Sequence, residues 1–126
     1  MSQVYRESKR TVLCIDDDDA VLASERLLLE EWGYIVLTTE SPQWGLTLAA
    51  LCQLDAVVLD YHMREMNGHA VAVAIKHYQP ETLIVMFSAT EIPEETRMLL
   101  NAAVVQTDAI KQVAPIVTRP IDLEES

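Results

Sequence analysis

Residues 11–19 read TVLCIDDDD, an apolar run that passes directly into four consecutive aspartates. The apolar part is rich in β-branched residues and is typical of a strand that is buried on both faces of a sheet. Residues 20–32 follow with apolar side chains at roughly helical spacing, and Asp18 or Asp19 is placed to cap the start of that helix. The stretch therefore predicts a buried strand, an acidic turn and an amphipathic helix in immediate succession.

The same alternation of a short apolar run and a longer amphipathic stretch recurs along the chain. It predicts βαβ units around a parallel sheet. Residues 102–106 are the first choice for the last strand, and residues 114–118 compete with them but leave only eight residues and no closing helix. The expected strands are 11–15, 34–39, 56–59, 82–87 and 102–106, and the expected helices are 20–32, 42–53, 69–79, 94–100 and 108–125, the last bent by Pro115.

Length and composition narrow the class of protein further. A chain of 126 residues, half of them apolar, suits one folded domain, which we expect at residues 11–126 after a flexible segment at 1–10. Twenty acidic against nine basic residues give a net charge of −11, which disfavours direct binding to nucleic acid or anionic membranes. No apolar run approaches the ~20 residues of a membrane span. Cys14 and Cys52 lie in apolar runs and fit reduced thiols, so we expect a cytoplasmic domain.

Acidic residues follow two of the expected strands. Asp16 and Asp17 come after the first strand, and Asp60 comes after the third. Ligands of open parallel sheets bind beyond the carboxyl ends of the strands, where these residues would meet. Carboxylates within ~5 Å repel by several kcal/mol at an effective dielectric near 20, so such a cluster takes up a proton or a cation. Oxygen-only ligands favour Mg²⁺ or Mn²⁺, although taken singly Asp17 also suits a helix cap and Asp60 a turn.

Three motifs, in order, resemble the receiver domain of two-component response regulators over residues 11–123: VLCIDDDD (12–19), VVLDYHMREMNG (57–68) and IVMFSAT (84–90). The resemblance implies a flavodoxin-like (βα)5 three-layer α/β sandwich with a five-stranded parallel sheet of order 2-1-3-4-5. It also implies a phosphoryl group carried on an aspartate in a Mg²⁺-dependent reaction, with Mn²⁺ as a second suitable ion.

The resemblance assigns roles to individual residues. Asp60 corresponds to the phosphoacceptor, and Ser88 to the hydroxyl residue that contacts the phosphoryl group. Asp17 would bind the metal directly and Asp16 through water or by orientation, with the main-chain carbonyl of His62 as a third protein ligand. These roles agree with the chemistry, because a carboxylate that attacks phosphohistidine needs its own charge and that of the phosphoryl oxygens neutralised.

The sequence departs from the family at the positions that read out phosphorylation. The family's lysine after strand five corresponds to Gln106, or to Arg119 if residues 114–118 form that strand. The family also has an aromatic residue three positions before that lysine, and this position is Ala103 or, in the second alignment, Ile116. Arg64 replaces the usual proline of the loop after strand three.

The family resemblance also implies partners. A sensor histidine kinase or a phosphotransfer protein would donate the phosphoryl group, and a downstream protein target would read the result; a homodimer is also compatible. The chain would be no enzyme beyond Mg²⁺-assisted self-phosphorylation and autodephosphorylation. One alternative is a phosphorylation-independent pseudo-receiver, favoured by the missing lysine. Another is a Mg²⁺-dependent phosphohydrolase with Asp60 as nucleophile, which would need a second acid where His62 stands and a cap for which the chain has no room.

Overall fold

A computed structural model of the chain describes residues 9–104. Their core is a five-stranded parallel sheet of order β2-β1-β3-β4-β5, which confirms the predicted fold class and strand order. The described helices are labelled α2 to α5, and none of them is long and apolar enough to cross a membrane. The strands are β1 (Thr11–Ile15), β2 (Ile35–Thr39), β3 (Ala56–Asp60), β4 (Leu83–Phe87) and β5 (Ala102–Val104), and the helices are α2 (Asp19–Glu31), α3 (Pro42–Leu51), α4 (Gly68–Tyr78) and α5 (Glu94–Arg97).

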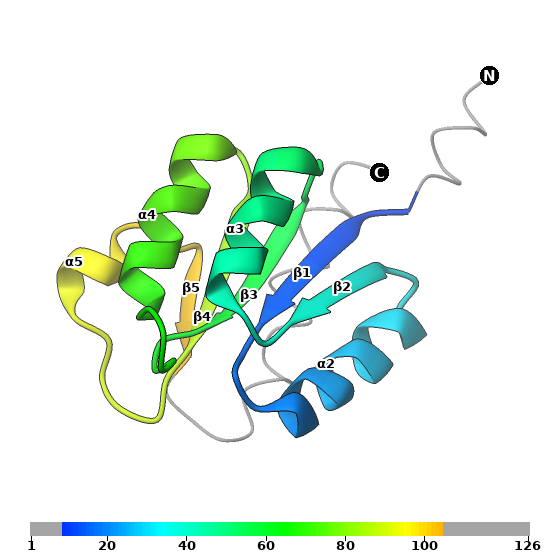
Figure 1. Ribbon diagram of the computed structural model, residues 1–126, viewed down its shortest axis with the longest axis horizontal. Helices are drawn as coiled ribbons and strands as arrows, with labels where there is room; N and C mark the ends of the chain where they lie inside the picture. The colour runs from blue at the N-terminus through cyan, green and yellow to red at the C-terminus, as the bar shows by residue number, and fades with distance from the viewer. Residues whose placement is uncertain (1–8, 105–126) are drawn as a thin grey trace.

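Two apolar clusters cover the two faces of the sheet. Figure 1 shows α3 and α4 side by side on one face, with α2 on the other. Alternate residues of β1 belong to the two clusters. Leu13 and Ile15 pack on the α3 and α4 side, and Val12 and Cys14 pack on the α2 side. All four side chains are buried, which explains why this strand is apolar throughout instead of alternating.

Side chains cap three of the four described helices at their N-termini. The Asp18 carboxylate accepts hydrogen bonds from the backbone N–H groups of Ala20 at 2.9 Å and Val21 at 3.4 Å, so Asp18 and not Asp19 is the N-cap of α2. Gly33 follows that helix with a φ of +94°, a left-handed conformation that glycine adopts without strain. Ser41 and Asn67 cap α3 and α4 in the same manner as Asp18.

Two predicted helices end early. Helix α3 stops at Leu51, before the predicted Gln53, because Cys52 adopts an extended conformation. Helix α5 stops at Arg97, before residue 100. There the backbone N–H groups of Leu99 and Leu100 donate to carbonyls only three residues back, which marks a tight turn instead of a continued α-helix.

The last strand begins where the first-choice alignment placed it. The side chain of Asn101 accepts from Ile84 N–H at 2.8 Å, and Val104 lies opposite Phe87 in the parallel register. The prediction of a strand at 102–106 is therefore confirmed as far as Val104. The predicted flexible segment at 1–10 falls outside the described residues except for its last two, and Gln106, Arg119, the competing strand at 114–118 and the helix at 108–125 lie outside them entirely.

Two glycines, Gly68 and Gly45, pack closely against the elements that carry the acidic residues. They differ in how well they should tolerate replacement by alanine. A Cβ on Gly68 would lie 2.8 Å from Tyr61 Cα and 2.9 Å from the Asp60 carbonyl oxygen, which are backbone atoms. A Cβ on Gly45 would meet chiefly the far end of the Ile15 side chain.

We expect Gly68→Ala to lower the free energy of unfolding by on the order of 2 kcal/mol, whereas Gly45→Ala, which gains helix propensity, costs less than about 1 kcal/mol. Urea unfolding of both variants measures this, and an equal loss would show that the loop after Asp60 can move aside.

Candidate functional site

Parallel pairing of β1 with β3 builds the acidic site. Ile15 lies opposite Leu59, so the residues that follow, Asp16 and Asp60, emerge at the same edge of the sheet. One carboxylate oxygen from each of Asp16, Asp17 and Asp60 lies within 4.8 Å of the others. The structure thus brings together the three acidic residues that the sequence singled out.

Each of these carboxylates is oriented by a backbone N–H group from a nearby loop. Asp16 accepts from Asp18 N–H at 2.9 Å, and Asp60 accepts from His62 N–H at 3.3 Å. Asp17 accepts from Arg64 N–H at 3.2 Å, a contact that joins the loop after β1 to the loop after β3. The loop backbone therefore orients all three carboxylates of the cluster.

Burial and mutual repulsion disfavour the ionised form of two members. Burial, followed by the charges of Asp60 and Asp17, raises the pKa of Asp16 from 3.8 to about 6, against a lowering effect of its bond from Asp18. Burial, followed by the charge of Asp17, likewise raises the pKa of Asp60 to about 6. A divalent cation would relieve both effects, and an all-oxygen donor set suits Mg²⁺, Mn²⁺ or Ca²⁺. The residues present therefore fit the predicted metal.

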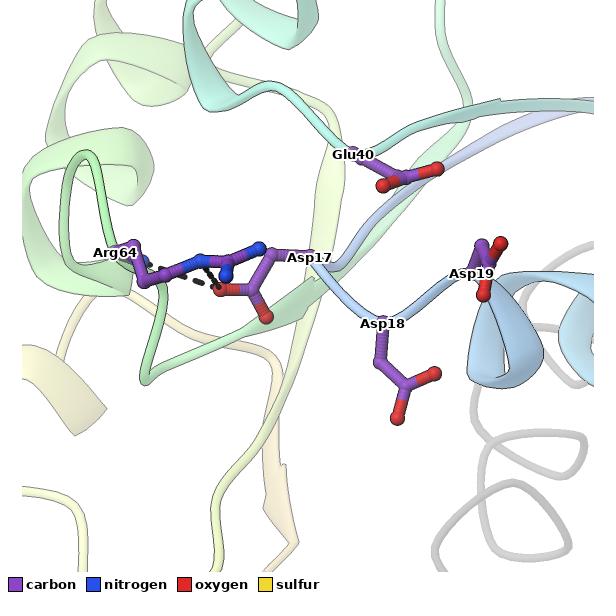
Figure 2. A pocket seen from close by; sticks show the side chains of 5 residues that line it. All are labelled: Asp17, Asp18, Asp19, Glu40 and Arg64. Carbon is purple, nitrogen blue, oxygen red and sulfur yellow. Dashed lines mark hydrogen bonds and ion pairs between the residues drawn. The ribbon is translucent and has the colours of Figure 1, made fainter.

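A shallow pocket lies beside the cluster and is lined by Asp17, Asp18, Asp19, Glu40 and Arg64. Figure 2 shows the Arg64 side chain reaching across to Asp17, with Glu40 on the other side of the pocket. The Nε atom of Arg64 lies 3.5 Å from Asp17 Oδ2. The sequence marks Arg64 only as a departure from the family. The ion pair could not be predicted, because nothing in the loop's sequence shows which way the side chain turns.

Ser88 follows β4 and is buried at the same edge of the sheet. Its N–H group donates to the Val104 carbonyl at 3.0 Å, and its hydroxyl accepts from Thr90 N–H at 3.1 Å. Thr90 Oγ1 lies 2.9 Å from Nε2 of His62, so this imidazole joins the loop after β3 to the loop after β4. The main-chain carbonyl role of His62 stays a prediction, and the sequence alone did not indicate the contact between its side chain and Thr90.

A buried carboxyl group on α2 was also missed. Glu25 is only 2% exposed and shares a hydrogen bond with the Cys14 thiol. Burial, followed by the charge of Asp16, raises the pKa of Glu25 to about 8. Within residues 9–104 its Oε1 atom has no hydrogen-bond partner. Helical spacing could have indicated this burial, because Glu25 falls between Leu22 and Leu29 on the buried face of the helix.

The fold and the site define the class of molecule as a flavodoxin-like α/β domain with an acidic edge beyond β1 and β3. The sequence model of the protein family described as the response regulator receiver domain matches residues 12–112. The chain therefore belongs to that family and is a receiver domain of the two-component type.

Individual relatives agree with this membership. The chain is 31% identical over 77 residues to the cell cycle response regulator CtrA of Brucella ovis, a match that covers 61% of this chain and spans a third (33%) of CtrA. A Burkholderia pseudomallei response regulator with a phosphorylated aspartic acid, calcium ion and citrate superimposes with a TM-score of 0.76 at 17% identity, covering 94% of this chain and 74% of that one. The Thermotoga maritima response regulator TrrA in complex with Mg(2+)-BeF gives a TM-score of 0.80 at 21% identity, covering 87% and 97%. At these identities the two structures establish the shared fold of this chain.

The raised pKa values predict a pH dependence of stability in the absence of divalent ions. The pKa of Asp60 is about 6 in the folded state against an ordinary 3.8, so as pH rises the unfolded state loses its proton first. Folding is therefore penalised progressively between about pH 4 and pH 6, and the penalty is complete above pH 6. We expect Asp60→Asn to raise the free energy of unfolding at pH 7.5 by on the order of 1 kcal/mol, and by less at pH 4.

Urea unfolding in a chelating buffer at the two pH values measures this difference. Asp19→Asn is the charge-matched control, because Asp19 is an exposed acid in the first turn of α2 outside the three-aspartate cluster. An Asp60→Asn variant that is no more stable than wild type at pH 7.5 would contradict the electrostatic account of the site.

Proposed function

We propose that this receiver domain accepts a phosphoryl group on Asp60 from the phosphohistidine of a sensor histidine kinase or phosphotransfer protein. The observation that carries the proposal is the position of the Asp60 carboxylate, at the end of a central strand and within 4.8 Å of ligand atoms on Asp16 and Asp17. Burial at this edge limits the hydration of the carboxylate, but Asp60 is only partly buried and so stays accessible to a partner.

In the proposed reaction a carboxylate oxygen of Asp60 attacks the phosphorus atom. The O–P bond forms as the P–N bond of phosphohistidine breaks, and the electron pair of that bond passes to the imidazole nitrogen, which takes up a proton. His62 N–H holds Asp60 Oδ1 in place during the attack. A bound divalent cation would supply neutralisation of the nucleophile and the phosphoryl oxygens together.

The proposed metal ligands are the carboxylates of Asp16, Asp17 and Asp60 with the main-chain carbonyl of His62. Mg²⁺ is the proposed ion and Mn²⁺ a substitute, since both prefer oxygen ligands. Support comes from the donor set itself and from the Mg(2+)-BeF and calcium complexes of the two similar response regulators.

Ser88 is the proposed hydroxyl contact of the phosphoryl group, because it follows β4 directly beside β3. The residue that replaces the family's lysine lies outside residues 9–104, and its assignment is a proposal. The start of β5 at Ala102–Val104 favours Gln106, two residues further on, over Arg119.

Signalling is proposed to pass through protein contacts, because a net charge of −11 opposes direct binding to nucleic acid. The domain would act as the substrate of its own phosphorylation and not as an enzyme on separate molecules. The proposed setting is cytoplasmic, and the unpaired thiols of Cys14 and Cys52 agree with it.

Intact mass spectrometry after incubation with acetyl phosphate tests the proposal. We expect wild type to gain one phosphoryl group in the presence of Mg²⁺ and none when the ion is chelated. Asp60→Asn should gain none, whereas Glu65→Gln, which removes an exposed acid from the same loop, should behave as wild type.

Uptake by Asp60→Asn would show that another residue is the acceptor. No uptake by a folded wild-type domain that binds Mg²⁺ would favour the phosphorylation-independent pseudo-receiver.

A further inference from the structure

Arg64 is the one basic side chain among the five residues that line the pocket, and the other four are acidic. It lies in the loop between β3 and α4, four residues after Asp60. Both its Nε atom, at 3.5 Å, and its backbone N–H, at 3.2 Å, contact the same oxygen of Asp17, Oδ2. Figure 2 shows the guanidinium group extended over that carboxylate.

We propose that Arg64 is the internal counter-ion of the phosphorylation site. Its guanidinium pairs with Asp17 in the metal-free domain, yields Asp17 to the divalent cation, and then turns to the phosphoryl group on Asp60. The inference rests on the proposed function, and it adds the residue that sets how strongly the site holds each ligand.

The contacts on Asp17 make Arg64 a competitor of the cation. Asp17 Oδ2 is engaged by two Arg64 groups, so a metal that binds Asp17 competes with the guanidinium for the same carboxylate. The guanidinium stays charged at all relevant pH values, so this competition is constant. The side chain of Arg64 is 84% exposed, and an exposed ion pair is weak enough for a divalent ion to displace.

The position of Arg64 also brings its loop close to Asp60. Asp17 and Asp60 offer ligand atoms within 4.8 Å of each other, and the Arg64 backbone is tied to Asp17. A phosphoryl group on Asp60 would therefore stand beside the loop that carries Arg64. The planar guanidinium offers paired donors that match phosphoryl oxygens, a geometry that the ammonium group of lysine lacks.

The two roles predict effects of opposite sign in one variant. Isothermal titration calorimetry with Mg²⁺ alone should show Arg64→Gln binding about threefold more tightly than wild type, because the competing cation is gone. With Mg²⁺ saturating, beryllofluoride serves as the phosphoryl analogue, and fluorine NMR should show Arg64→Gln binding it about fivefold more weakly.

Two matched variants serve as controls. Arg97→Gln removes one positive charge from α5, outside the pocket lining, and should leave both affinities as in wild type. Arg64→Lys keeps the charge without the planar fork, so it should bind Mg²⁺ as wild type does while recovering only part of the beryllofluoride affinity.

The outcomes separate this inference from the proposed function. Equal Mg²⁺ affinities in wild type and Arg64→Gln, or equal tightening in Arg97→Gln, would overturn the counter-ion role. Beryllofluoride binding that is the same in wild type and Arg64→Gln would overturn the phosphoryl contact alone. A wild-type domain that binds Mg²⁺ but no beryllofluoride would contradict the proposed function, and the phosphoryl contact with it.

Discussion

Repulsion among Asp16, Asp17 and Asp60 is the constraint on which the carboxyl edge of the sheet depends. Parallel pairing of β1 with β3 places the three carboxylates within 4.8 Å of one another, and burial raises the pKa of two of them to about 6. The loops around the three carboxylates supply groups that interact favourably with this negative charge. Backbone N–H groups orient each carboxylate, and Arg64 supplies a positive charge beside Asp17. A site that is already organised but electrostatically unsatisfied is suited to take up a divalent cation and a phosphoryl group together.

The rest of the structure holds this edge in place. The central strands are buried on both faces, so their register cannot shift without exposing apolar side chains. At the amino-terminal side of the sheet, Gln79 connects the ends of several elements: its amide nitrogen donates to the carbonyls of Ala49 and Cys52, and its amide oxygen accepts from Leu54 N–H. One end of the domain is therefore fixed by satisfied hydrogen bonds, while the other carries the charge that makes it responsive to ligands.

The sequence was sufficient for the fold and for the acidic cluster. Short apolar runs predicted each strand, and parallel strands bring their carboxyl ends to one edge, so Asp16, Asp17 and Asp60 could be placed without coordinates. Arg64, Thr90 and the imidazole of His62 could not, because their contacts depend on how two irregular loops approach each other in space. Glu25 is a different case. Its helical spacing placed it on the buried face of α2, but burial was not predicted because the residue type is charged.

The central claim is that the three-aspartate cluster is a divalent cation site, and linkage between metal binding and folding tests it most directly. Urea unfolding of the chain at pH 7.5 should give a free energy of unfolding that rises with Mg²⁺ concentration, approaching about 1.4 kcal/mol for each tenfold increase above Kd. Asp17→Ala should abolish the rise, and Asp19→Ala should retain it. A free energy of unfolding that does not change with Mg²⁺, or that rises equally in both variants, would contradict the account.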